Sequence, residues 1–183
     1  MACQIPFVVA TGPTRHSSRP ASRVSGGPLC VGGLLSFSLG IAGKRRCTSE
    51  KKMTATCACG QASITVNSRP TMLGVCHCTN CKRRTGSAFG ISAYFEKTSV
   101  VSQRGETKTY TFWHKAQSNE QVRHFCSNCG TTLFWFVSTL PESIGVAGGC
   151  FAEQGLPEPT YSVTDRKREA WLSLPHNWKV WAD

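Results

Sequence analysis

The chain has 183 residues, of which 40% are apolar and eleven are cysteines, and its formal net charge is +11. This length suits one domain plus an appendage. The charge is uneven, because residues 1–52 hold eight Lys or Arg and one acid, whereas residues 53–183 hold thirteen Lys or Arg and nine acids. Residues 53–183 are therefore only mildly basic, and nucleic acid is not an expected partner.

The first 49 residues contain no Asp or Glu and are rich in Ser, Gly and Arg. This composition is typical of a transit peptide for a plastid or a mitochondrion. The alternative is a disordered tail on a cytoplasmic protein. An apolar run at residues 29–43 is interrupted by Gly and Ser and is shorter than the roughly 20 residues of a membrane span. We predict that residues 1–52 form a disordered targeting extension and that the remaining domain has no membrane span.

From residue 53 onward the sequence favours β-structure. Runs rich in β-branched and aromatic residues alternate with Gly- and Pro-containing turns, and they predict strands over residues 61–67, 89–95, 106–113, 131–137 and 143–146. Helical periodicity is weak throughout. We therefore predict that residues 53–183 form a single, mostly β domain of short strands and long turns. Six aromatic residues are expected in its core: Phe89, Phe95, Phe112, Trp113, Phe134 and Trp135.

Seven cysteines of this domain lie in three tight groups: Cys57 and Cys59; Cys76, Cys78 and Cys81; Cys126 and Cys129. Cys-x-Cys and Cys-x-x-Cys spacings allow the sulfurs of one group to reach a single ion at about 2.3 Å, the usual Zn–S distance. The same spacings are poor geometry for disulfides within a group. The three groups therefore indicate metal sites and a reducing compartment.

Seven thiolates can be divided into one closed site of four ligands and one site of three ligands with an open position. In the first pairing, Cys57 and Cys59 join Cys126 and Cys129 in a structural zinc site, and Cys76, Cys78 and Cys81 hold a second Zn²⁺. A second pairing forms a zinc ribbon from Cys78, Cys81, Cys126 and Cys129. That ribbon leaves the other three cysteines as a poor trio, so the first pairing is preferred.

The three-cysteine site is predicted to bind an external thiol rather than to hydrolyse a substrate. Three thiolates on Zn²⁺ leave one net negative charge, so the ion is a poor Lewis acid, and a soft fourth thiolate suits the open position. Lys82, Arg83 and Arg84 follow Cys81 directly. Their positive charges could offset a fourth thiolate or hold a substrate carboxylate.

Three further residues close to these motifs are considered as ligands or reactive groups. His77 lies between two candidate ligands, and strand alternation directs it away from the metal. His124 is expected to support the site rather than to ligate the ion. Cys150 is either a reactive thiol near the site or a buried free cysteine.

Together the three motifs resemble the glutathione-dependent formaldehyde-activating enzyme family, which also includes centromere protein V. The shared signature is Cys57-x-Cys59-Gly60, then CHCTNCKRRTGSAFG at residues 76–90, then RHFCSNCGT at residues 123–131. The resemblance implies a zinc-stabilised, Mss-four-like β fold. It also implies that Cys57, Cys59, Cys126 and Cys129 are structural ligands and that Cys76, Cys78 and Cys81 are ligands of the catalytic zinc.

The resemblance further implies a carbon–sulfur lyase that condenses formaldehyde with glutathione to S-(hydroxymethyl)glutathione. The expected partners are two Zn²⁺ per chain, glutathione or another small thiol, and a formaldehyde-like carbonyl, with Lys82, Arg83 and Arg84 as substrate contacts. A non-catalytic zinc module that binds another protein is the alternative function. The chain departs from the family pattern at residues 149–153, where an acidic pair is usual, and at Tyr161-Ser162, where His-Ile is usual.

Overall fold

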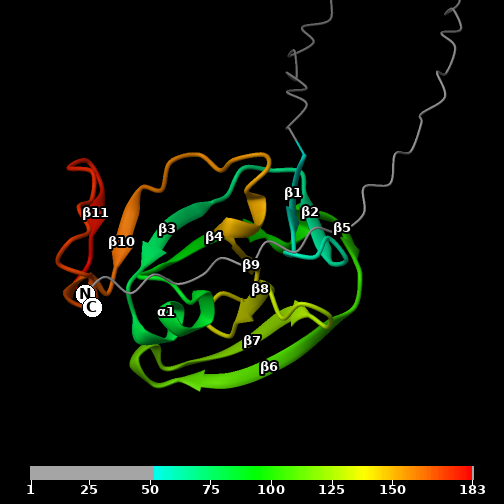
Figure 1. Cartoon of the computed structure of the whole chain (residues 1–183), viewed down its shortest axis with the longest axis horizontal. Helices are drawn as coiled ribbons and strands as arrows, with labels where there is room; N and C mark the ends of the chain where they lie inside the picture. The colour runs from blue at the N-terminus through cyan, green and yellow to red at the C-terminus, as the bar shows by residue number, and fades with distance from the viewer. Residues whose placement is uncertain (1–51, 183) are drawn as a thin grey trace, which may run out of the picture. The chain divides into compact units, whose positions relative to one another are not determined.

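The computed structural model describes residues 52–182. Eleven strands in this range form two sheets (Figure 1). The strands are β1 Met53–Thr56, β2 Ser63–Val66, β3 Met72–Cys76, β4 Gly90–Glu96, β5 Val100–Arg104, β6 Thr107–His114, β7 Asn119–Cys126, β8 Thr132–Val137, β9 Ser143–Ala147, β10 Tyr161–Val163 and β11 Lys179–Val180. One helix, α1 (Thr79–Thr85), and four short 3-10 turns complete the described part of the chain: η1 Lys97–Ser99, η2 Lys115–Gln117, η3 Gly148–Phe151 and η4 Asp165–Lys167.

The small sheet has the strand order β1-β2-β5, and the large sheet has the order β11-β10-β3-β4-β9-β8-β7-β6. Neighbouring strands are antiparallel except for β10, which runs parallel to both β3 and β11. The predicted mostly β single domain is therefore confirmed. The five strands expected from the sequence are β2, β4, β6, β8 and β9, each with ends within two residues of the expected ones. The other six strands and α1 were not anticipated.

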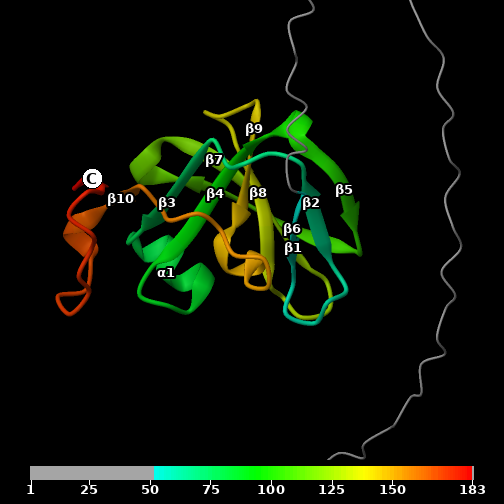
Figure 2. The same ribbon diagram turned by 90° about the horizontal axis from the view of Figure 1, so that it is seen from above.

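The main core lies between the two sheets, on one face of β4 and its neighbours. Strand side chains alternate between faces, so Ala93 and Phe95 are fully buried in this core, while Ser92 and Tyr94 line a cavity on the other face. The ring of Phe151 in η3 closes the core at 5.8 Å from that of Phe95. Figure 2 shows the small sheet and α1 on opposite sides of β4.

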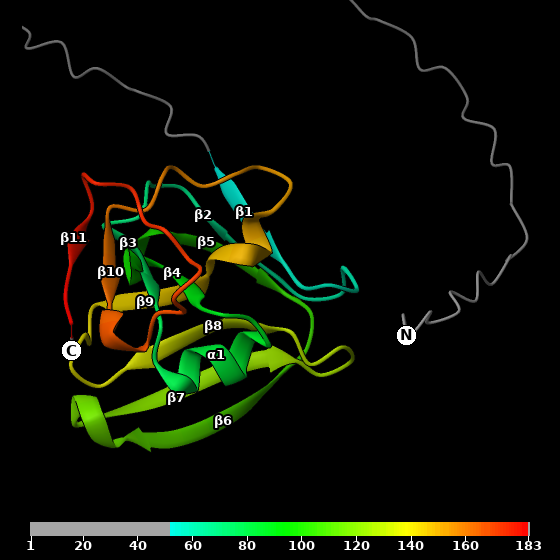
Figure 3. The ribbon, with the colours of Figure 1, turned by 60° about the vertical axis from the view of Figure 1, so that its left-hand side comes forward.

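Helix α1 lies over the second face of the large sheet, beside β7 and β8 (Figure 3). The Cys78 sulfur caps its first turn by accepting a hydrogen bond from the Cys81 N–H at 3.3 Å. Gly86 ends the helix in the left-handed region, with φ of 63°, a conformation that glycine adopts without steric cost. The helix is thereby held at both ends over the cavity face.

One prediction from the sequence is wrong in part, and another concerns residues that the structure does not describe. Trp113 was expected in the core, but it is 59% exposed because it lies on β6, the edge strand of the large sheet. Phe89 and Phe112, also expected there, are half-buried and belong to neither core cluster. The expected targeting extension lies outside the described residues. No helix within residues 52–182 is both long enough and apolar enough to cross a membrane.

Candidate metal centres and adjoining cavities

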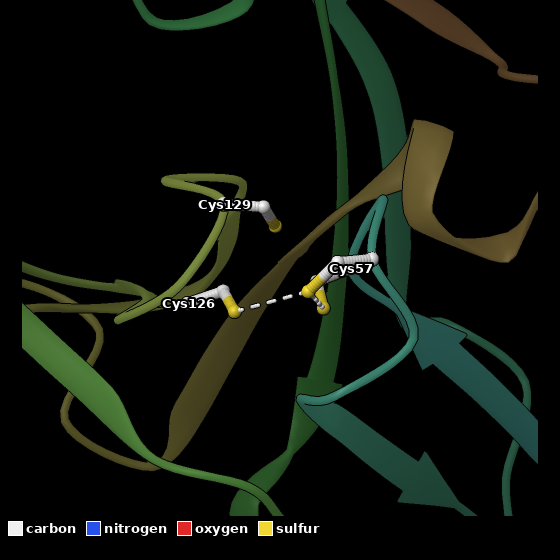
Figure 4. Close-up of side chains that lie close together, drawn as sticks. Cys57, Cys126 and Cys129 are labelled. Atoms are coloured by element: carbon white, nitrogen blue, oxygen red, sulfur yellow. Dashed lines mark hydrogen bonds between the residues drawn. The ribbon is translucent and has the colours of Figure 1, made fainter.

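Cys57, Cys59, Cys126 and Cys129 form a four-cysteine cluster, in which all Sγ atoms lie within 4.8 Å of one another. The Cys59 sulfur is 3.5 Å from that of Cys57 and 3.7 Å from that of Cys126. Figure 4 shows the sulfurs of Cys57, Cys126 and Cys129 converging from two loops. Four sulfurs at about 2.3 Å from one tetrahedral Zn²⁺ are about 3.8 Å apart. The cluster therefore fits one such ion.

Two similar turns position these sulfurs. The Gly60 N–H donates to the Cys57 carbonyl, and the Gly130 N–H donates to the Cys126 carbonyl, each at 3.0 Å. Both glycines have positive φ, 78° for Gly60 and 73° for Gly130, which side-chain-bearing residues rarely adopt. The glycine that follows each cysteine pair is thus required by the turn that directs the sulfurs inward.

Cys76, Cys78 and Cys81 form a separate three-cysteine cluster, with their Sγ atoms also within 4.8 Å of one another. Cys76 ends β3, Cys78 caps α1, and Cys81 lies in the first turn of the helix. This grouping shows that the zinc-ribbon pairing is wrong, because Cys78 and Cys81 lie with Cys76 rather than with Cys126 and Cys129.

The chemistry of the three-cysteine cluster also favours a cation. Contacts with Cys78 and then Cys81, followed by burial, raise the pKa of the Cys76 thiol. Three thiolates at such short distances repel one another in a buried site. A bound divalent cation removes this repulsion and allows all three sulfurs to be thiolates.

A cavity of about 400 Å³, the smaller cavity, adjoins the three-cysteine cluster. Its volume lies within the range of small-molecule sites, roughly 300–1,000 Å³. None of the residues that line it is an aspartate or a glutamate. Besides the cysteines, its lining includes Tyr94, His114, Gln121, Arg123, Trp135 and Tyr161.

Arg123 is a charged residue of the cavity that was not predicted from the sequence. It was noted there only as the first residue of the third cysteine motif, with no role of its own. Its side chain is 8% exposed, and it donates to Asn80 Oδ1 at 3.2 Å and to Gln121 Oε1 at 3.4 Å. Its guanidinium lies 4.5 Å from the Phe112 ring centroid. Burial, and then the nearby charge of Arg84, lower the pKa of Arg123, but a guanidinium stays protonated in proteins. The smaller cavity therefore contains a fixed positive charge.

Of the three basic residues predicted to contact substrate, only Arg84 lines this cavity. Its guanidinium lies 4.6 Å from the Trp135 ring centroid, and its Nη2 has no hydrogen-bond partner among the described residues. Lys82 forms an ion pair with Glu169. Arg83 is exposed, and neither Lys82 nor Arg83 lines the smaller cavity or the larger one described below.

Neither histidine near the motifs belongs to a cysteine cluster. His77 is fully buried, its ring lies edge-on to Phe89 at 5.9 Å, and burial lowers its pKa. His124 stacks on Phe134 with ring centroids 4.4 Å apart. Both histidines pack against aromatic rings, and His77 lies outside the cysteine clusters, as the sequence predicted.

Cys150 is a half-buried thiol on a second cavity of about 840 Å³, the larger cavity, which adjoins the four-cysteine cluster. Burial raises the pKa of Cys150 to about 11, so the thiol is protonated at neutral pH. The thiol also lies 3.7 Å from the Thr132 carbonyl, to which it donates. Of the two possibilities open in the sequence, the structure favours a buried free cysteine over a reactive one.

Tyr161, one of the residues that depart from the family pattern, forms a wall of the smaller cavity. Its ring covers Gly74, where an added Cβ would lie 2.2 Å from Tyr161 Cε2.

We expect Gly74→Ala to displace Tyr161 and to lower the free energy of unfolding by about 1–3 kcal/mol, the usual cost of overpacking. Urea denaturation measures this. Gly149→Ala is the control, because a Cβ there meets nothing within 4 Å, and an equal loss in both variants would contradict the expectation.

A Rhodobacter sphaeroides protein of known structure is 26% identical to the chain, with a TM-score of 0.43, and the match covers 57% of this chain and 91% of that one. A comparison with curated proteins found no match. The profile of the family described as glutathione-dependent formaldehyde-activating enzyme matches residues 52–167, which contain both cysteine clusters. The chain belongs to the glutathione-dependent formaldehyde-activating enzyme family.

Proposed function

We propose that the protein is a zinc-dependent carbon–sulfur lyase of the S-(hydroxymethyl)glutathione synthase type, which acts on a small thiol and formaldehyde. The observation that carries this proposal is the position of the three-cysteine cluster on the wall of the smaller cavity. Cys76, Cys78 and Cys81 would hold one Zn²⁺ at that wall. The four-cysteine cluster would hold a second Zn²⁺, which has no open position and therefore a structural role.

A zinc ion held by three thiolates would offer one position to the sulfur of a fourth thiolate. The residues of the smaller cavity would bind the rest of the thiol and place its sulfur beside the carbonyl carbon, which is how positioning accelerates an addition. In this addition a C–S bond forms, the C=O bond becomes a C–O single bond, and the proton of the thiol is transferred to that oxygen. No oxidant or reductant is consumed.

Tyr94 is the residue best placed to handle this proton. Tyr94 lines the cavity, and its hydroxyl accepts a hydrogen bond from Trp135 Nε1 at 3.3 Å. Burial raises the pKa of Tyr94, so the hydroxyl stays protonated and its own hydrogen is free to point into the cavity. We assign Tyr94 as the donor that stabilises the developing alkoxide oxygen.

The second candidate function is a non-catalytic zinc module that binds another protein. It is favoured by the free edge of β6, where Tyr110 is 56% exposed and Trp113 is 59% exposed. An open edge strand with exposed aromatic residues can accept a strand from a partner. The polar cavity beside the cysteines has no role in that function.

A titration of the cobalt-substituted full chain with glutathione tests the first proposal. We expect the cobalt absorption spectrum to change on binding of the glutathione sulfur, and S-methylglutathione to cause no change because its sulfur is blocked. Exchange between formaldehyde and glutathione should also exceed the uncatalysed rate. A spectrum that is unaffected by glutathione would rule out the thiol-binding site. A change in the spectrum without faster exchange would show that the site binds the thiol but does not catalyse the addition, and would overturn the proposed lyase activity.

A further inference from the structure

We infer that Arg123 and Arg84 form an anion site in the smaller cavity that binds a carboxylate of the incoming thiol. The inference rests on the proposed function, because it requires a thiol to bind beside the three-cysteine cluster. It goes further in assigning selectivity. The cavity would accept thiols that carry a carboxylate and disfavour neutral or cationic thiols of similar size.

Arg123 and Arg84 have no acidic counter-charge in the smaller cavity. Both arginines line the cavity, and no acidic residue does. The ion pairs found among residues 52–182 join Lys82 to Glu169 and Arg168 to Asp165, and neither involves these arginines. A buried charge without a partner is strongly unfavourable. The natural partner of two guanidinium groups in such a site is an anion from outside the chain.

Neutral side chains hold Arg123 in place. Its two terminal nitrogens donate to the amide oxygens of Asn80 and Gln121, while Phe112 supports one face of the guanidinium. These neutral partners orient the group without cancelling its charge. A guanidinium held in a single orientation presents the planar set of donors that matches a carboxylate.

Several buried polar atoms of the residues that line the smaller cavity have no hydrogen-bond partner in the described part of the chain. Within the described part of the chain, Arg123 Nε and Arg84 Nη2 donate to no acceptor. Asn119 Oδ1 and His114 Nδ1, which belong to residues of the same cavity, also have no partner there. Buried polar groups are normally hydrogen-bonded, so this cluster points to a polar ligand that supplies the missing contacts.

The thiolates of the three-cysteine cluster are the competing explanation for the two positive charges. With zinc bound, the cluster would carry one negative charge, and a fourth thiolate would add another. In that case the arginines would balance the sulfurs and would not contact a carboxylate. The two explanations differ in one respect, because only the carboxylate site distinguishes an acid from its ester when both carry the same thiol.

The test is a titration of the cobalt-substituted full chain with glutathione and with its diethyl ester, followed by the cobalt spectrum. We expect the ester to bind roughly ten- to a hundredfold more weakly, which corresponds to the loss of a charge-assisted hydrogen bond. Equal affinities would overturn the anion site but leave thiol binding intact. If neither compound changes the spectrum, the proposed function and this inference both fail.

A variant pair assigns the effect to the cavity arginines. Arg123→Gln should weaken glutathione binding and bring the acid and the ester to similar affinities. Arg104→Gln removes the same charge from an exposed position on β5 and should leave the preference for the acid unchanged. Loss of the preference in both variants, or in neither, would contradict a site at Arg123. If Arg123→Gln fails to fold, Arg84→Gln takes its place in the test. The preference for the acid should then be present in the unaltered chain and reduced in Arg84→Gln, and an unchanged preference would contradict the anion site.

Discussion

Replacement of Cys126 by serine is expected to leave the β domain unfolded. Cys126 is 1% exposed and ends β7, where the four-cysteine cluster joins the β7–β8 turn to the turn after β1. A structural zinc site contributes on the order of 10 kcal/mol of apparent folding energy, comparable with the roughly 5–15 kcal/mol of total stability of a typical domain. Losing one ligand would therefore remove most of the free energy that stabilises the folded domain.

Circular dichroism on heating and the zinc content measure this effect. The matched control is Cys150→Ser, because Cys150 is a half-buried cysteine outside both clusters. We expect that control to melt cooperatively and to retain two zinc ions per chain. A Cys126→Ser protein that also melts cooperatively, within a few degrees of the unaltered chain, would show that the four-cysteine cluster does not hold the fold together.

Replacement of Cys78 by serine is expected to remove one of the two zinc ions, together with the response to glutathione, while the domain stays folded. The three-cysteine cluster links residues that are close in sequence, from Cys76 to Cys81. A link across so short a loop restricts the unfolded chain little. Serine is also a favoured N-cap, so α1 would keep the capping interaction that Cys78 makes.

Zinc analysis, the melting temperature and the cobalt titration test this second expectation together. Cys150→Ser again serves as control and should keep both ions and the glutathione response. Loss of both ions from Cys78→Ser would mean that the two clusters are not independent. A glutathione response that survives in Cys78→Ser would move the thiol-binding position away from this cluster.

Helix α1 shows why part of the site could not be predicted from the sequence. It is seven residues long, contains no buried residue and has a cysteine as its N-cap, so it lacks both the apolar periodicity and the common capping residue that identify helices. The helical geometry also explains why only one of the three predicted basic residues lines the smaller cavity. Successive helical residues point about 100° apart, and so Arg84 lines the cavity while Lys82 and Arg83 do not.

Strand β7 shows a second reason why part of the site could not be predicted from the sequence. Asn119, Gln121 and Arg123 alternate along it and are all buried, although polar side chains at alternate positions normally indicate an exposed face. They are buried here because other elements cover this face of the large sheet. Asn80 of α1 meets Arg123, and Phe112 of β6 lies against the same guanidinium.

The spacing of the seven cysteines was sufficient to predict three groups of metal ligands, because cysteines one or two residues apart can reach the same ion. The tertiary structure decided between the two possible pairings, because it brings Cys57 and Cys59 to Cys126 and Cys129. Runs of β-branched and aromatic residues between turn residues identified five of the eleven strands, since the preference for a strand is partly a local property of the sequence. The charge of the cavity was decided only in the tertiary structure. Arg84 and Arg123 are far apart in the chain. No local sequence pattern shows that they line one cavity, or that this cavity contains no acidic residue. Their common environment exists only because β7 and α1 meet over one face of the sheet.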